Sequence, residues 1–176
     1  MSFEPAKEKL TIGSVDNTSV HVEAQYNPKE LQVDKVIPWT KANQANKTSN
    51  EGIHLEFSGA EGRTMTVEMM FDGFEKNESV APKIKVLEDL ASVITVAGEK
   101  EDERRPHRCT ISWGKKGLPR FDCVIEHIST KYTMFSSDGV PLRATCTVKL
   151  KEANAVSAKK PPASGGGGGG APAGGA

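Results

Sequence analysis

The sequence predicts a mainly β domain, built as a barrel or a sandwich, with one α-helix at its flank. Apolar and polar residues alternate in several runs, one stretch has apolar residues at spacings of three and four, and an Asp-Gly turn separates the last two alternating runs. Period two is typical of a strand with one buried face, and spacings of three and four are typical of an amphipathic helix.

The alternating runs give each predicted strand one apolar face. The clearest is Leu142–Leu150, where Leu, Ala, Cys, Val and Leu alternate with Arg, Thr, Thr and Lys. Successive side chains of a strand point to opposite faces, so the apolar set lies on one side. The same pattern predicts strands at Val20–Tyr26, Met65–Phe71 and Cys109–Trp113.

The run from Phe121 to Phe135 is longer than an ordinary strand, and its apolar phase changes within it. The first apolar residues share one parity, and the later ones, Ile128, Tyr132 and Met134, share the other. A β-bulge near His127 would reset the phase and bend the strand. The turn at 136–141 contains Asp-Gly, which favours a tight reversal, so the last strand should pair back antiparallel.

One helix is predicted within Ser79–Val96. Its apolar positions recur at helical spacing along one stripe: Val80, Ile84, Leu87, Ala91 and Ile94. Ser79 is the expected N-cap, Pro82 suits the first turn, and Gly98 the C-terminal stop.

The segment Asp34–Gly52 is polar, with Trp39 as its lone large aromatic. It is either a long loop or an extended arm, and structureless loops of this length in compact domains are often functional. For Trp39, packing within the chain and docking at an interface are equally good interpretations.

Composition divides the chain into a folded domain, 1–152, and a tail, 153–176. The tail is rich in Lys, Pro and Gly and includes six consecutive glycines, so we expect it to be disordered. The chain carries 23 basic and 23 acidic residues, which argues against a nucleic-acid partner. The first ten residues do not form a signal peptide, and no run is long and apolar enough for membrane insertion.

No catalytic, cofactor or metal site is predicted. Cys109 and Cys123 have histidines nearby in sequence, but the spacings do not match zinc-binding pairs. These cysteines and Cys146 lie on apolar strand faces, where a free thiol behaves as a small hydrophobe. We therefore expect all three to be buried and unpaired, and we expect the protein not to be an enzyme.

Two stretches resemble a known family. They are 24–31, Ala-Gln-Tyr-Asn-Pro-Lys-Glu-Leu, followed by Trp39, and 111–144, which ends in Phe-Ser-Ser-Asp-Gly-Val-Pro-Leu-Arg-Ala. Over residues 8–152 the chain resembles the tube-type domain of contractile injection systems, a family that includes the hub–tube adaptor, or tube initiator, of phage-tail-like particles. Many members continue into a LysM-like domain, whereas this chain continues into its glycine-rich tail.

The resemblance implies a phage tail-tube-like β fold and a structural role. Six copies would form a homo-hexameric ring that joins the spike hub to the inner tube, among other baseplate proteins, and templates tube assembly. The protein would be made in the bacterial cytoplasm and become part of a particle that can be released. On this basis the candidate assembly residues are Tyr26, Asn27, Pro28, Trp39, Asp138, Gly139, Pro141 and Arg143.

Other functions remain open from the sequence. The chain could be an inner tube subunit proper, or a monomeric β-sandwich binding module whose ligand contacts the Asp34–Gly52 arm. A hydrolase with Cys or His chemistry is a third class, although the sequence has no Gly-x-Ser-x-Gly nucleophile elbow.

Overall fold

The computed structural model describes residues 8–41, 54–95, 104–114 and 117–156. This part of the chain is mainly β with one helix, α1 (Ala81–Ala91), which confirms the predicted class. The strands are β1 (Leu10–Ser14), β2 (His21–Glu23), β3 (Gln32–Asp34), β4 (Trp39–Lys41), β5 (Leu55–Phe57), β6 (Thr64–Asp72), β7 (Val93–Ile94), β8 (Arg105–Pro106), β9 (Cys109–Trp113), β10 (Phe121–Phe135) and β11 (Pro141–Glu152).

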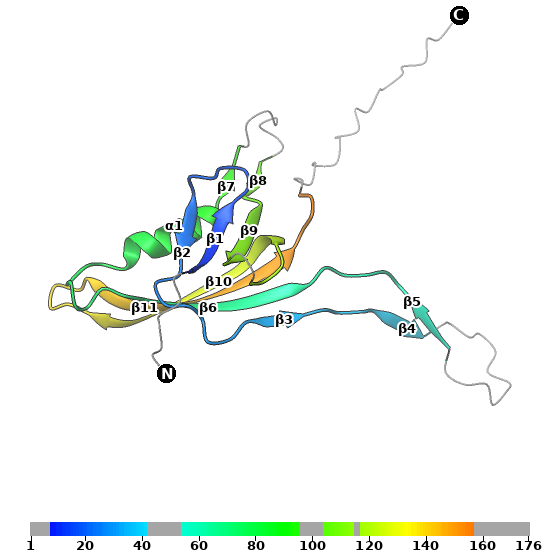
Figure 1. Ribbon diagram of the computed structural model, residues 1–176, viewed down its shortest axis with the longest axis horizontal. Coiled ribbons are helices and arrows are strands. Elements are labelled where there is room, and N and C mark those ends of the chain that lie inside the picture. The colour runs from blue at the N-terminus through cyan, green and yellow to red at the C-terminus, as the bar shows by residue number, and fades with distance from the viewer. Residues whose placement is uncertain (1–7, 42–53, 96–103, 115–116, 157–176) are drawn as a thin grey trace, which may run out of the picture.

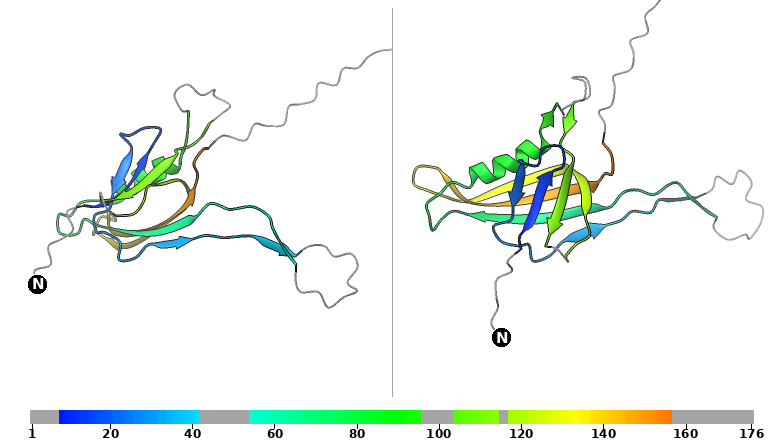
Figure 2. Two further views of the ribbon diagram at one scale, coloured as in Figure 1. Left: turned by 45° about the vertical axis from the view of Figure 1, so that its right-hand side comes forward. Right: turned by 45° about the horizontal axis from the view of Figure 1, so that its top comes forward.

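Seven strands form one antiparallel sheet in the order β2-β1-β9-β10-β11-β6-β3. The sheet makes two layers because β10 pairs with β9 only through Phe121–Cys123 and pairs with β11 from Cys123 to Phe135. Figures 1 and 2 show β2, β1 and β9 lying across the layer formed by β10, β11, β6 and β3. Within the described residues the sheet does not close into a barrel, so the sandwich is the arrangement found.

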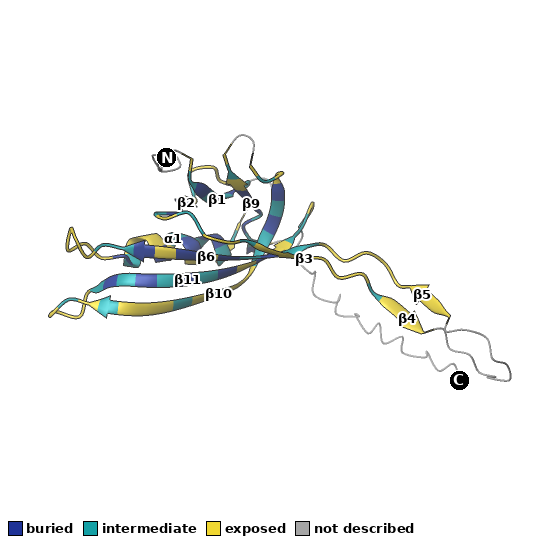
Figure 3. Cartoon of the chain, turned by 60° about the horizontal axis from the view of Figure 1, so that its bottom comes forward, coloured by how far each residue is buried: buried dark blue, intermediate teal, exposed yellow. Residues whose placement is uncertain are grey.

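The core lies between the two layers and under α1. The alternation along β6 and β11 is kept in the ladder, where Val67 faces Val148 and Met69 faces Cys146. The helix adds Ile84, Leu87 and Leu90, all buried. The elements α1, β1 and β9 cover one side of the β10-β11-β6-β3 layer, and no described element covers the opposite, bare side, as Figure 3 shows.

The predicted bulge in β10 is confirmed. The register slips between Ile125 and His127, so Ile125 and Ile128 face Leu150 and Val148 on the buried side. A second slip, between Tyr132 and Met134, places Met134 opposite Arg143 on the bare side. The prediction that Met134 shares a face with Ile128 and Tyr132 was therefore wrong, because one bulge does not account for the whole strand.

The helix lies within the predicted range but ends five residues early, and the prediction of Ser79 as its N-cap was wrong. Val80 takes the N-cap position, while the Ser79 hydroxyl accepts a hydrogen bond from the Ala81 N–H at 3.2 Å. Residues 93–95 are Val-Ile-Thr, and this β-branched run favours extended backbone. Ile94 accordingly lies in β7, paired with β8, rather than on the helix.

Some expectations lie outside the described residues. They concern Val96 and Gly98 at the expected helix end, residues 42–52 of the arm, and most of the tail, 157–176. The domain boundary at 152 stays a prediction, although the Ala153 N–H donates to the Asp122 carbonyl at 3.0 Å. No helix of the described part is long and apolar enough to cross a bilayer.

Candidate assembly surfaces

The arm is a two-stranded ribbon that projects from one end of the four-stranded layer (Figure 1). It leaves the body after β3, and β4 pairs antiparallel with β5 so that Trp39 faces Phe57. Besides the β4–β5 ladder, the Thr40 hydroxyl donates to the Glu56 carbonyl at 3.3 Å, and both the hydroxyl and the N–H of Ser58 donate to the Pro38 carbonyl at 3.2 Å.

The arm's aromatic pair is exposed. The Trp39 and Phe57 ring centroids are 5.5 Å apart, yet these residues are 57% and 54% exposed. Val36, Ile37 and Leu55 are also large, apolar and exposed on the same arm. A cluster of this kind marks an interaction site rather than a contribution to the fold.

A charged clamp fixes the base of the arm to the body. The Arg63 guanidinium donates to both carboxylate oxygens of Glu152, at 2.7 and 3.1 Å, and the Arg63 N–H donates to the same carboxylate at 2.8 Å. These hydrogen bonds lower the pKa of Glu152 to about 2. The clamp is therefore charged at neutral pH and restricts the direction of the arm.

A shallow groove of about 370 Å³ lies beside β6, lined by Tyr26, Asn27, Pro28, Lys29, Glu30, Glu68 and Met70. Tyr26 and Met70 are 48% and 39% exposed. The Asn27 amide fixes the turn, because its Oδ1 accepts from the Leu10 N–H at 3.0 Å and its Nδ2 donates to the Glu8 carbonyl at 2.9 Å. This turn holds Tyr26 and Pro28 beside Met70.

The remaining candidates lie at the β10–β11 turn. Gly139 has φ +79°, the left-handed region that favours glycine, and its N–H donates to the Ser136 carbonyl at 3.1 Å. The Pro141 carbonyl accepts from the Val80 N–H, and Arg143 Nε donates to Asp72 at 3.0 Å. Arg143 and Pro141 thus stabilise this end of the layer, and Asp138 is exposed at the tip.

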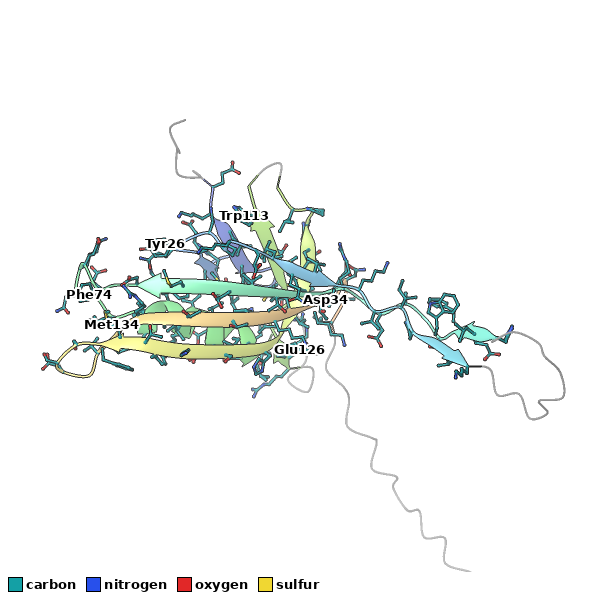
Figure 4. The ribbon with its side chains drawn as sticks, turned by 90° about the horizontal axis from the view of Figure 1, so that it is seen from below. Tyr26, Asp34, Phe74, Trp113, Glu126 and Met134 are labelled. Atoms are coloured by element: carbon teal, nitrogen blue, oxygen red, sulfur yellow. The ribbon has the colours of Figure 1, made fainter. Side chains whose placement is uncertain are left out.

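The bare side of the layer is polar and carries few apolar groups. Its side chains come from the alternate positions of the ladder, Thr64, Thr66, Glu68, Met70 and Asp72 of β6 and Arg143, Thr145, Thr147, Lys149 and Lys151 of β11. Ion pairs cross it, with Arg143 bonded to Asp72 and Lys149 Nζ lying 3.4 Å from a Glu126 oxygen. Figure 4 views this surface directly.

The layer has two open edges. Among the described residues, β3 pairs only with β6, and the Val124–Phe135 part of β10 pairs only with β11. The two edges run in opposite directions, because three antiparallel steps separate β3 from β10. Unpaired backbone groups along such edges are available to another chain.

A buried polar cluster joins β1 to the β8–β9 segment. The Ser14 hydroxyl is 2.7 Å from His107 Nδ1 and accepts the N–H groups of Asp16 and Asn17. With its lone pairs occupied in this way, the hydroxyl donates to His107. Asp16 accepts two hydrogen bonds from Arg105, which lower the pKa of Asp16. Ser14 and His107 are both buried, an arrangement typical of a structural link.

The three cysteines are buried and free, as predicted. Burial raises the pKa of Cys109 and of Cys123 to about 12, and it also raises the pKa of Cys146. A thiol with so high a pKa is a poor nucleophile and a poor metal ligand at neutral pH. Within the described residues no group of three or more His, Cys, Asp or Glu could hold a metal ion.

The structure separates the predicted assembly residues into three places. Tyr26, Asn27 and Pro28 form the groove, Trp39 lies on the arm, and the residues from Asp138 to Arg143 lie at the β10–β11 end. Sequence reasoning missed Met70 and Phe57. The alternation of Leu55-Glu56-Phe57 is a signal for β5, but three residues are too few to distinguish a strand from a loop.

Comparison with known protein families gives a match over most of the chain. Residues 6–160 match the family model described as contractile injection system tube protein. No curated protein matches the chain.

Proposed function

Because the chain belongs to the contractile injection system tube protein family, we propose that it is a non-enzymatic ring subunit of such a particle, located where the spike hub meets the inner tube. In this role it forms a homo-hexamer that templates the tube. The open edges of the β10-β11-β6-β3 layer are the observation that carries the proposal.

The two edges can pair with each other in a closed ring. All copies in a ring point the same way along its axis, so β3 of one copy lies beside β10 of the next and runs antiparallel to it. Each junction then continues the hydrogen-bonding pattern of the layer. Closure pairs the two edges along the length of β3, which removes exposed edge that otherwise is a site of uncontrolled association.

The two sides of the layer support the assignment of inside and outside. The covered side carries α1 and the β2-β1-β9 layer, which need the larger space outside a ring (Figure 2). The bare polar side then faces a water-filled channel. Six copies of four strands, at about 4.8 Å per strand, give a circumference of about 115 Å and a backbone diameter of about 37 Å for strands parallel to the axis.

An inner tube subunit proper is the second candidate, favoured by the position of the arm. The arm extends along the strand direction, beyond the end of the layer, so it reaches toward an adjacent ring (Figure 1). A tube needs contacts between adjacent rings along its whole length, whereas a junction ring needs them only where it meets the tube.

Deleting the gene in the producing bacterium, followed by electron microscopy, separates these roles. For a junction ring we expect hubs and baseplates without an attached tube and without this ring. For a tube subunit we expect an intact junction ring with nothing stacked on it. The mass of the purified protein tests ring formation, with about six copies, or a multiple of six for stacked rings, expected. A strictly monomeric protein whose deletion leaves normal contractile particles would refute both and favour a monomeric binding module.

A further inference from the structure

We propose that the aromatic pair of the arm, Trp39 and Phe57, docks into the Tyr26–Pro28–Met70 groove of a second copy of this chain, displaced along the strand axis. The inference rests on the proposed function and identifies the surfaces by which consecutive rings of this chain are joined. The proposed junction then contains at least two such rings.

The two surfaces match in chemistry. The arm offers two aromatic rings that the chain itself leaves more than half exposed. The groove offers a tyrosine, a proline and a methionine, and its volume of about 370 Å³ is sufficient for an aromatic side chain. Methionine is well suited to such contacts because its flexible thioether packs favourably on aromatic rings.

The charges beside the two surfaces are also complementary. Lys41 lies on the same face of the ribbon as Trp39 and Phe57, whereas Glu56, paired with Thr40, lies on the opposite face. The groove carries Lys29 together with Glu30 and Glu68. The arm's lysine therefore meets the carboxylates of Glu30 and Glu68 when the aromatic pair docks, which sets orientation more than affinity.

The positions of the two surfaces exclude docking within one chain. Asp34, where the arm begins, faces Thr64 at one end of β6, and Met70 lies toward the other end. Figure 4 shows Asp34 on the arm side and Tyr26 and Phe74 toward the opposite end. The distance from the groove to the aromatic pair has two parts, from Met70 to Thr64 along β6 and from Asp34, the partner of Thr64, to Trp39 along the arm. Together they cover eleven residue steps, which is about 37 Å at 3.3 to 3.4 Å per residue.

A second copy shifted by that distance along the strands brings its groove to the arm of the first. The contact joins different surfaces on the two copies, so it can repeat from ring to ring without closing on itself. The inference therefore predicts an axial repeat of about 37 Å wherever rings of this chain are stacked.

The first test is disulfide trapping in the full-length protein. Phe57→Cys combined with Met70→Cys places one thiol on the arm and one in the groove. Under a mild copper oxidant we expect a ladder of covalent oligomers on a non-reducing gel. Phe57→Cys combined with Phe74→Cys is the matched control, because Phe74 is exposed at the same end but does not line the groove. The native cysteines are buried and should not contribute.

The second test is Trp39→Ala, with Phe74→Ala as its control. Loss of a central aromatic anchor should weaken each arm–groove contact about thirtyfold. We expect Trp39→Ala to form single rings of normal mass that no longer stack, while Phe74→Ala stacks normally. Tyr26→Ala with Met70→Ala should reproduce the stacking defect from the groove side.

These outcomes separate the inference from the proposed function. Stacked rings that form normally with Trp39→Ala, or a ladder from the control cysteine pair alone, would overturn the arm–groove contact and leave the ring intact. Failure of the unmodified protein to form rings at all would instead remove the proposed function.

Discussion

The ion pair between Asp16 and Arg105 should stabilise the domain more than any exposed pair. Asp16 accepts from Arg105 at 2.8 and 3.2 Å and from the Arg108 N–H at 2.7 Å. The Asp16 and Arg105 side chains are only 12% and 9% exposed, so water has little access to the pair. Asp16→Asn removes the negative charge while keeping an oxygen acceptor and the side-chain shape.

The expected loss follows from removing the carboxylate charge that accepts two hydrogen bonds from the Arg105 guanidinium. Removing one partner of a buried pair costs about 3 to 5 kcal/mol, and the retained acceptor places this variant near 3 kcal/mol. With a denaturant slope near 2 kcal/mol per molar, the urea midpoint should fall by about 1.5 M. Asp89→Asn is the control, since the Lys85–Asp89 pair is exposed at both ends and its loss should leave the midpoint unchanged.

Acid should reduce the difference in stability between the unmodified protein and Asp16→Asn. Hydrogen bonds from Arg105 hold the pKa of Asp16 below its usual value of 3.8. A carboxyl with a lowered folded pKa contributes stability above its unfolded pKa, and that contribution is lost as pH falls through the folded value. Urea curves at pH 7 should therefore differ strongly, and the gap should narrow below about pH 4. A loss no greater than that of Asp89→Asn at pH 7 would contradict the reasoning.

Three further predictions concern the core and the last turn. Cys146→Ser should lower stability by about 1 kcal/mol in thermal unfolding, since Thr130 lies 3.5 Å from the sulfur and can bond the new hydroxyl. Cys109 and Cys123, with pKa values near 12, should resist iodoacetamide in native protein at pH 8, and rapid labelling would refute their burial. Gly139→Val should destabilise by about 1 to 2 kcal/mol through backbone strain alone, as nothing lies within 4 Å of an added Cβ, and Gly139→Asn should cost less. Equal melting temperatures for the two would show that φ at this position is not constrained.

Local patterns determined which parts of the fold were predictable. The alternation along β6 and β11 assigns each residue to a face without reference to any partner, and the phase change in β10 marks the bulge. The end of α1 was misplaced because Ile94 continues the helical spacing while its β-branched neighbours oppose it. At this position the β-branched run, paired with β8, outweighs the helical spacing of the apolar residues.

Contacts between distant segments were not predictable. Trp39 faces Phe57 across a long polar segment whose pattern does not fix the pairing register, and Asp16 bonds Arg105, which is 89 positions away in the sequence. The groove likewise combines the turn at Asn27 with Met70, which lies on the polar face of β6, where the period-two pattern gives no reason to expect a binding surface. Such sites depend on topology, which one sequence does not specify.

The pairing of β6 with β11 has a mechanical consequence for a particle that drives its tube forward. Nine successive residue pairs join these strands, from Arg143 with Asp72 to Lys151 with Thr64. In the proposed ring the firing thrust acts along the strands, while the hydrogen bonds lie across them. The bonds are then loaded in shear and must break together, whereas a pull at right angles would open them one at a time. Because β10 continues from this layer into its pairing with β9, part of the thrust also passes into the second layer, and the two halves of the sandwich resist as one body.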